Sequence, residues 1–171
     1  MKLSALTSRS VSRWIWPALL VLAADQTTKL AVERFLPMDS IRAVIPNLFN
    51  LVNTTNPGVA FGLLANTHAA WVGHALALFS VVVMIFLAWM LAARRAGGVL
   101  SEWGMSLILG GAAGNVLDRL IHGSVTDFLD FYWRTHHWPA FNVADSAIVI
   151  GAGLVLIELF LERPQPAEEG I

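Results

Sequence analysis

Four long apolar segments dominate this chain of 171 residues and restrict its fold more than any other feature. They cover about Trp14–Phe35, Ala69–Ala93, Leu100–Ile121 and Asn142–Glu162, and each approaches the roughly 20 residues that a helix needs to cross a bilayer. Lipid cannot hydrogen-bond a polypeptide backbone, so a spanning segment must pair its own peptide groups as a helix. Only 13% of the residues are charged, where soluble domains average about 25%. We therefore predict an all-α membrane protein with four transmembrane helices.

Basic residues indicate which ends of these segments face the cytoplasm. They concentrate before the first segment, between the second and third, and after the fourth: Lys2, Arg9, Arg13, Arg94, Arg95 and Arg163. The two remaining connections, at about residues 37–68 and 122–141, hold only Arg42 and Arg134. The positive-inside rule then predicts both termini in the cytoplasm and both of these connections on the outer face.

The length fits one domain, and we predict a single membrane domain over residues 1–163. The polar end of the chain, residues 164–171, is predicted to be a disordered tail. Residues 1–24 also fit a secretory signal peptide, with a basic start and an apolar core. Against that interpretation, the apolar pattern resumes after Lys29, and removal of the peptide would leave three spans.

The first outer connection has a different pattern from the apolar segments. Between Ser40 and Leu64, β-branched and aromatic residues occur in short runs that are broken by Pro46, Asn47 and an Asn-Pro-Gly turn. We expect short strands or an extended platform at the membrane surface.

The first apolar segment carries two opposite charges. Asp25 and Lys29 are four residues apart, so they share one face of a helix. A charge at the centre of a spanning helix costs about 2.5–3.5 kcal/mol on insertion scales, so both need a reason to be there. Either the pair neutralises itself within the packing, or it supports a site near the outer face, and the two are compatible.

The third segment combines glycines with polar side chains. Gly110 and Gly114 form a small-xxx-small face, which lets another helix come close. Asn115 shares a face with Asp118 and with Arg119, whereas Asp118 and Arg119 point about 100° apart. Each of these two needs a partner elsewhere, and the charges of the first segment are candidates. A structural polar lock and direct chemistry both fit these residues.

Three carboxylates fall at the outer membrane boundary. Asp127 and Asp130 come just after the third segment, and Asp145 lies in the first turn of the fourth, behind the helix-capping residue Asn142. An acid at a helix start can simply compensate the helix dipole. Two close carboxylates, however, tend to share one proton, so one can activate water while the other donates a proton. Such a pair can hydrolyse an amide without a metal, a cofactor or a covalent intermediate.

Other chemistries lack residues in this sequence. There is no cysteine, which excludes disulfides, thiol nucleophiles and cysteine-bound metals. The histidines are scattered and make no convincing metal-binding set: His68, His74, His122, His136 and His137. Neither a Gly-x-Ser-x-Gly nor a His-Glu-x-x-His motif is present, and no basic stripe suits nucleic acid. We expect no cofactor, no metal and no nucleic-acid partner.

Five short motifs on this four-segment frame resemble the bacterial prolipoprotein signal peptidases, also called signal peptidase II. The motifs are DQTTK (Asp25–Lys29), NPGVAFGLL (Asn56–Leu64), GGAAGNVLDR (Gly110–Arg119), VTDF (Val125–Phe128) and FNVADSA (Phe141–Ala147). One alone would be weak, but five in order along nearly the whole chain are specific. The resemblance implies an inner-membrane aspartyl endopeptidase. It would remove signal peptides from diacylglyceryl-modified prolipoproteins and cut just before the lipidated cysteine.

The same resemblance assigns roles to individual residues. It implies that Asp127 and Asp145 are the catalytic pair. It implies that nine further residues bind substrate or support the site: Asp25, Lys29, Asn56, Gly58, Asn115, Asp118, Arg119, Asn142 and Ser146. It also implies an extracytoplasmic β-rich cradle above the four helices, contact with membrane lipid, and inhibition by the cyclic peptide globomycin.

Two positions depart from the family pattern. Pro57 stands where a small or polar residue is more usual between Asn56 and Gly58, and it removes one backbone N–H, which puts any donor role of that amide in doubt. Thr126 stands where a second valine is common. Neither change removes a functional side chain.

Two other classes of function stay as alternatives. A proton-coupled transporter would place ionisable groups at several depths and often has repeated halves, whereas these acids cluster toward one face and the halves do not match. A non-catalytic scaffold would use the glycines as an association face, but it leaves the cost of the membrane carboxylates unexplained.

Overall fold

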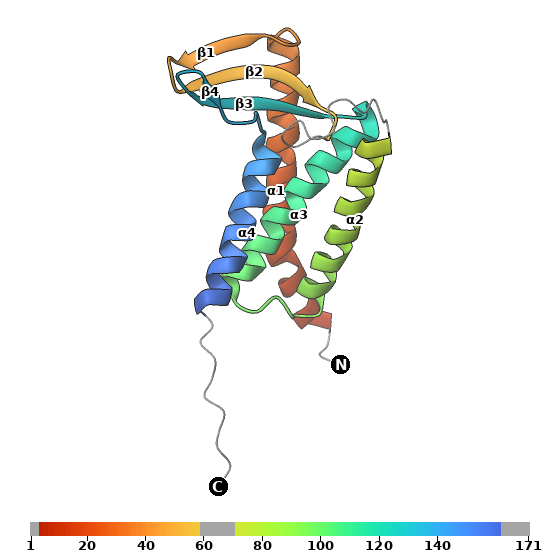
Figure 1. Ribbon diagram of the computed structural model, residues 1–171. Coiled ribbons are helices and arrows are strands. Elements are labelled where there is room, and N and C mark those ends of the chain that lie inside the picture. Colours follow the sequence, from red (N-terminus) through yellow and green to blue (C-terminus); the bar gives the residue numbers. More distant parts are fainter. Residues whose placement is uncertain (1–3, 59–70, 162–171) are drawn as a thin grey trace.

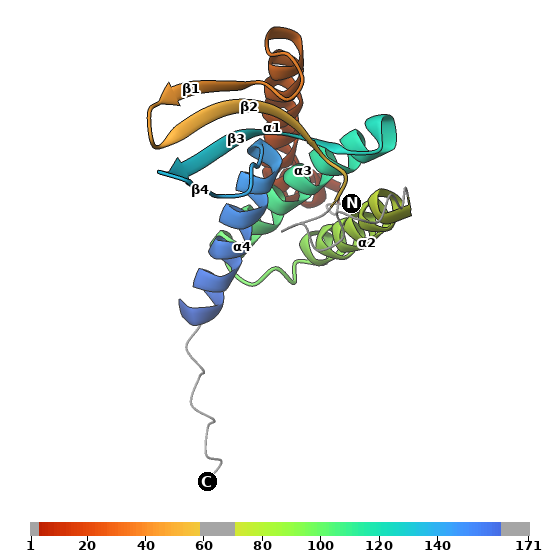
Figure 2. The ribbon, with the colours of Figure 1, turned by 45° about the horizontal axis from the view of Figure 1, so that its top comes forward.

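The computed structural model describes residues 4–58 and 71–161, with side chains from residue 13 onward, as a helical bundle with a small sheet at one end (Figure 1). Within these residues the elements follow in the order α1 (Ser4–Phe35), β1 (Ile41–Ile45), β2 (Phe49–Asn56), α2 (Trp71–Ala92), α3 (Val99–His122), β3 (Val125–Trp133), β4 (His136–His137) and α4 (Val143–Leu161). The sheet lies where α1 and α3 end and α4 begins (Figures 1 and 2). The fold is thus mostly helical with a small antiparallel sheet.

Helix α3 is the centre of the bundle and packs against α1, α2 and α4. Its glycines allow this, because they bring backbones closer than a Cβ would permit. Gly104 of α3 and Gly151 of α4 face each other, and a Cβ on either would collide with the other's carbonyl oxygen. Gly110 lies in the same way against the carbonyl of Ala18 in α1. The small-residue face predicted from the sequence therefore packs against α1.

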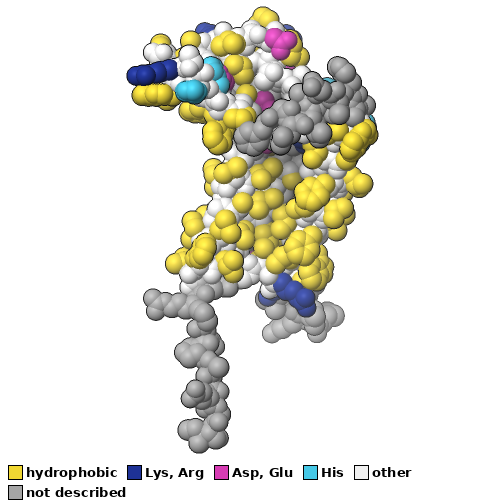
Figure 3. All heavy atoms as spheres, in the orientation of Figure 1, with side chains coloured by type: hydrophobic (Ala, Val, Ile, Leu, Met, Phe, Trp, Pro, Cys, Tyr) yellow, Lys and Arg dark blue, Asp and Glu magenta, His cyan; other side chains and the backbone are white. Residues whose placement is uncertain are grey.

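The helices differ in how well they suit a bilayer. Of the described helices, α2 and α4 alone are long and apolar enough to cross a membrane, with mean hydropathies of 2.6 and 2.1. Helices α1 and α3 carry more charge, but Asp25, Lys29 and Asp118 are buried inside the bundle rather than facing outward. Hydrophobic side chains cover the bundle face seen in Figure 3, with charged groups toward its two ends. Spanning by α1 and α3 stays a prediction.

The sheet has the strand order β1-β2-β3-β4, and its neighbouring strands are antiparallel. Its register places Asn50 of β2 opposite Asp130 of β3. Beyond β4 the chain stays beside β3, because Leu129 forms a further bridge with Phe141. Strand β3 is therefore paired with the residues that lead directly into α4.

The sequence located some of these elements and missed others. Strands β1 and β2 lie in the segment where strands were expected, while residues 59–64 and the predicted tail at 164–171 lie outside the described residues. Helix α1 begins at Ser4, well before Trp14. Strands β3 and β4 were not predicted, although Val125–Trp133 is rich in β-branched and aromatic residues.

Candidate active site

Asp127 and Asp145 reach one asparagine from two different elements. Asp127 lies near the start of β3, and Asp145 lies in the first turn of α4. Asn142, fully buried just before α4, bridges them: its Nδ2 donates to Asp127 Oδ1 over 2.7 Å, and its Oδ1 accepts the Asp145 N–H over 2.9 Å. Asp145 Oδ2 in turn accepts the Asn142 N–H over 3.3 Å, which completes a capping box. The cap that starts α4 therefore also places the two carboxylates.

Asp127 lies in a protected environment, with 2% of its surface exposed. Its Oδ2 accepts a hydrogen bond from Asn56 Nδ2 over 3.1 Å. Burial, followed by the negative charge of Asp145, raises the pKa of Asp127 to about 6, against the opposing effects of the Asn56 and Asn142 donors and of the Lys29 charge. A carboxyl group with this pKa can hold or release a proton near neutral pH, as general acid–base catalysis requires.

Asn115 of α3 orients the second carboxylate. Its Nδ2 donates to Asp145 Oδ1 over 2.7 Å, and its Oδ1 accepts from Lys29 Nζ over 3.2 Å and from Asn142 Nδ2 over 3.4 Å. An ammonium group can only donate, so Asn115 must turn its carbonyl oxygen toward Lys29. Its amide nitrogen is left facing Asp145. The charge of Lys29 thus fixes which end of Asn115 meets the carboxylate.

Lys29 also joins the two buried carboxylates of the helices. Its Nζ lies 2.8 Å from Asp25 Oδ2 and 2.7 Å from Asp118 Oδ2. Asp25 accepts the Ala144 N–H over 2.9 Å, and Asp118 accepts the Thr126 N–H over 3.4 Å. Ala144 and Thr126 are the residues immediately before the two aspartates of the candidate site. Lys29 therefore balances one of the two carboxylate charges, and the cluster also bonds to the backbone next to both aspartates of the candidate site. These contacts are compatible with both interpretations of the sequence.

Gly58 fixes the orientation of Asn56. Its φ is +111°, and a Cβ there would collide with Leu76, so only glycine fits without strain. The Gly58 N–H donates to Asn56 Oδ1 over 2.9 Å, which turns the Asn56 amide nitrogen toward Asp127. Pro57 does not disturb this arrangement, because the donor is the amide of Gly58.

Arg119 brings a positive charge to the same place. Its guanidinium interacts with the charges of Asp145, Asp127 and Asp118. Its Nη1 donates to the carbonyl of Asn115 over 3.3 Å, and its buried Nε has no hydrogen-bond partner among the described residues. The guanidinium fork therefore keeps donor capacity that these residues do not use.

A hollow of about 670 Å³ opens beside these groups. Its polar lining includes Asn56, Gly58, Arg119, Asp145 and Ser146, and its apolar lining comes from α2, α4 and the segment before α4. Ser146 donates its hydroxyl to the Asn142 carbonyl over 2.9 Å, within its own helix. The hollow thus has one polar wall, which carries a carboxylate and a guanidinium, and one apolar wall.

Asp130 belongs to different surroundings, although it is only three residues from Asp127. Successive residues of a strand alternate between its faces, so an odd separation places the two side chains on opposite faces. Asp130 accepts from Asn50 Nδ2 over 2.8 Å and lies 2.9 Å from His137 Nδ1. The structure therefore brings Asp127, and not Asp130, to Asn142.

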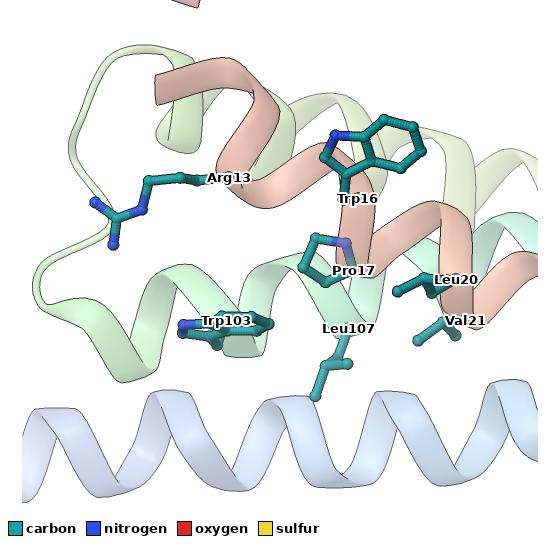
Figure 4. A pocket seen from close by; sticks show the side chains of 7 residues that line it. All are labelled: Arg13, Trp16, Pro17, Leu20, Val21, Trp103 and Leu107. Atoms are coloured by element: carbon teal, nitrogen blue, oxygen red, sulfur yellow. The ribbon is translucent and has the colours of Figure 1, made fainter. Parts of the chain in front are cut away.

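Another hollow, of about 590 Å³, lies between α1 and α3 near the opposite end of the bundle (Figure 4). Its lining side chains are Arg13, Trp16, Pro17, Leu20, Val21, Trp103 and Leu107. Arg13 is the one ionisable group in that lining, so no acid–base pair is available there. Within the described residues, no group of three potential metal ligands occurs.

Two contributors to the site were not singled out from the sequence. Gln26 bridges the ion cluster, since its Nε2 donates to Asp118 Oδ1 over 2.8 Å and to Asp25 Oδ2 over 3.3 Å. Glu33 accepts the hydroxyl of Thr126 over 2.7 Å. Gln26 lies inside the DQTTK motif, where its position between the charged residues Asp25 and Lys29 was the available signal.

Comparison with known proteins agrees with this geometry. The sequence model of the signal peptidase II family matches residues 17–161. The lipoprotein signal peptidase of Solibacter usitatus is 47% identical over 150 residues, which cover 88% of this chain and 92% of the relative. The lipoprotein signal peptidase of Vibrio cholerae is 41% identical over 167 residues, covering 94% of each chain. A solved structure described as a bacterial membrane enzyme superposes with a TM-score of 0.79 at 26% identity, covering 94% of this chain and 95% of that one.

The family match, together with the fold shared with a solved bacterial membrane enzyme, defines this chain as a membrane protease. It belongs to the signal peptidase II family.

Proposed function

We propose that this chain is an aspartyl endopeptidase that removes signal peptides from diacylglyceryl-modified prolipoproteins and cuts just before the lipidated cysteine. Asp127 and Asp145 are its catalytic pair and hold one proton between them. The ionised carboxylate takes a proton from a water molecule, which attacks the scissile carbonyl carbon. The protonated carboxyl donates to the carbonyl oxygen, which gives a gem-diol. The C–N bond then breaks as the carboxyl that took the proton from water gives it to the leaving amine, and a gem-diol hydroxyl returns its proton to the other carboxylate, so the pair again holds one proton. These steps need no metal, cofactor or covalent intermediate.

The observation that carries the proposal is the bridge through Asn142. One side chain bonds to the Asp127 carboxylate at 2.7 Å and to the Asp145 backbone at 2.9 Å. The charge of Asp145 then helps to raise the pKa of Asp127 to about 6. A pair that shares one proton, with Asp145 in the lining of an open hollow, has what the reaction requires.

The remaining site residues divide into three groups in this proposal. Asn56, Asn115 and Asn142 orient the carboxylates, and Asp25, Lys29 and Asp118 hold the backbone on which they stand. Arg119, Gly58 and Ser146 line the hollow and contact the substrate there.

We extend the proposal to the membrane. All four helices span the bilayer as one domain over residues 1–163, both termini lie in the cytoplasm, and the site lies toward the outer face of the inner membrane. At about 1.5 Å per residue, α1 with its 32 residues is about 48 Å long, more than the roughly 30 Å of a hydrocarbon core. Asp25 and Lys29 are buried against α3, so they need not meet lipid, while the exposed charges Arg13, Glu33 and Arg34 lie nearer the two ends of the helix.

The apolar wall of the hollow suggests where lipid enters. Leu76, Val149 and Ile150 come from helices that are apolar enough to face the bilayer. We propose that this wall receives the diacylglyceryl chains of the substrate from the membrane, and that globomycin-type inhibitors compete for the same hollow.

The test is cleavage by purified protein in detergent, with no ion gradient. The wild-type protein should cut a diacylglyceryl-modified precursor before its cysteine and leave the unmodified precursor largely intact. Asp127→Asn and Asp145→Asn should each lower kcat by about 10³-fold with an unchanged melting temperature. The matched control is Arg42→Gln on exposed β1, which should keep wild-type activity. Normal cleavage by either aspartate variant would refute the catalytic pair, and no cleavage by the wild type would refute the function.

A further inference from the structure

A second hollow, of about 430 Å³, lies on the sheet itself. Residues from the start of β1 to the segment beyond β4 contribute to it, and its ionisable groups are Asp39, Asp130 and His137. The two arginines of the sheet region, Arg42 and Arg134, are not part of its lining. The proposed catalytic steps use none of these groups.

This sheet hollow adjoins the candidate active site. Trp138, Pro139 and Ala140 line both hollows, so this strip of chain is the wall between them. A peptide that occupied the catalytic hollow and continued over the strip would enter the sheet hollow. In the proposed topology the signal segment stays with the helices, and the part of the substrate beyond the cut leaves toward the sheet.

The lining of the sheet hollow is rich in hydrogen-bond acceptors. Asn53 is 3% exposed, and its Nδ2 is committed to the Leu36 carbonyl at 2.9 Å, which fixes its Oδ1 as the free end. That Oδ1 and the Ser40 hydroxyl are buried without a hydrogen-bond partner among the described residues. Both atoms are covered by protein, so they make the wall of the hollow electronegative without contacting a group inside it, and this favours a donor over an acceptor in the hollow.

The ionisable groups of the sheet hollow also favour a hydrogen-bond donor. Asp130 is buried behind His137, and Asp39 is exposed at the edge of the hollow. Two carboxylates and one imidazole favour a positively charged or hydrogen-donating group over an acid, because a like charge is repelled.

We propose that the sheet hollow is a subsite for the mature part of the precursor, the extended peptide just after the lipidated cysteine. It prefers a basic or hydroxyl side chain there and disfavours an acidic one. This subsite rests on the proposed function, because it needs a precursor cut in the neighbouring hollow.

The experiment uses lipidated precursor peptides that differ in one residue. At each of the second to sixth positions after the cut, that residue is Lys, Ser or Glu. With the purified full-length protein at low ionic strength, kcat/KM for Lys should exceed that for Glu by about fivefold at one or two of these positions, chiefly through KM. High salt should remove most of this ratio.

Two isosteric variants locate the effect. Asp130→Asn and Asp39→Asn should each reduce the Lys-to-Glu ratio by half or more, while Glu102→Gln at the far end of the bundle should leave it unchanged. Asp39 has a φ of +58°, which asparagine also tolerates. If Asp130→Asn does not fold, the Lys-to-Glu ratio of Asp39→Asn therefore tests the subsite.

A merely structural role would lower kcat for all three peptides alike and keep the ratio, which would overturn the subsite. Efficient cleavage with a ratio near one at every position would also overturn the subsite and leave the proposed function intact. Failure of the wild type to cut any of the peptides would instead refute the proposed function, and the subsite with it.

Discussion

The two halves of the bundle are held together by different physical means. Near the sheet, α1, α3 and α4 meet through a polar junction, which consists of Asp25, Lys29, Asn115, Asp118 and Asn142. These side chains are buried, and hydrogen bonds and ion pairs of 2.7–3.4 Å join them to each other and to the two aspartates of the candidate site. Further from the sheet, the helices meet through close backbone packing at Gly104, Gly151 and neighbouring residues.

The difference indicates what each half is for. A buried ion pair adds little net stability over an apolar contact of the same shape, but removing one partner is costly. The close packing of Gly104 on Gly151 stabilises through many small dispersion contacts and touches no residue of the candidate site, whereas Gly111 and Gly114 bring α3 against Ala144 and Asp25 within the polar junction. We infer that the polar junction serves to place Asp127 and Asp145, while the glycine-packed half supplies ordinary helix association.

The largest effect is expected at the centre of the polar junction. Lys29→Met leaves Asp25 and Asp118 buried without their cation, so it should lower the free energy of unfolding by about 3–5 kcal/mol and abolish cleavage. Denaturation in detergent and a cleavage assay measure the two losses.

The matched control for Lys29 is an exposed ion pair at the far end. Arg13 and Glu102 lie 3.6 Å apart with side chains 63% and 40% exposed, so Arg13→Gln should cost less than about 1 kcal/mol and leave cleavage unchanged. Equal losses in the two variants would show that the polar junction has no special position in the bundle.

A substitution in the glycine-packed half should lower the stability of the protein and leave the pH profile of cleavage unchanged. Gly104→Ala adds a Cβ against Gly151 and Val155, and we expect a loss of about 1–3 kcal/mol in unfolding free energy. The protein that remains folded should keep its pH profile, because this contact touches no residue of the site. Gly153→Ala is the control, since a Cβ there meets nothing within 4 Å. If Gly104→Ala changed the pH profile, the separation between the two halves would be wrong.

A smaller effect is expected at the start of α3. The cap position Gly98 makes no side-chain bond, and Glu158 of α4 instead accepts the N–H of Leu100 at 2.7 Å and of Ser101 at 3.3 Å. Glu158→Ala removes this substitute cap and should lower stability by about 1 kcal/mol with no change in cleavage. An unchanged melting temperature would show that the two bonds contribute nothing measurable.

The positions of the apolar helices could be predicted from the sequence better than the contacts of the polar junction. The second, third and fourth apolar segments match α2, α3 and α4 closely, because a run of about 20 apolar residues has few other folds available. The start of α1 was missed, because its first turns carry no such run. Asn142 was placed correctly before α4, since helix capping is a local property.

The polar junction depends on contacts between distant parts of the chain, and sequence patterns constrain such contacts weakly. The charges of the first segment were considered as partners for Asp118, and the bond from Lys29 agrees with that, but nothing local indicated that Asp25 would cap α4. Strand β3 was not predicted, because it contains two aspartates, a residue type that is rare in strands. The face that each aspartate occupies became visible only with the register of the sheet.

The central claim is that Asp127 and Asp145 act as one unit that holds a single proton. Infrared difference spectra between the wild type and Asp127→Asn isolate the protonated Asp127 carboxyl and follow it with pH. The account predicts that this band falls to half its height near pH 6 in the wild type. Asp145→Asn removes a negative charge that raises this pKa, so there the midpoint should move to lower pH. The same midpoint in both proteins, or a fully ionised Asp127 at pH 5 in the wild type, would contradict it.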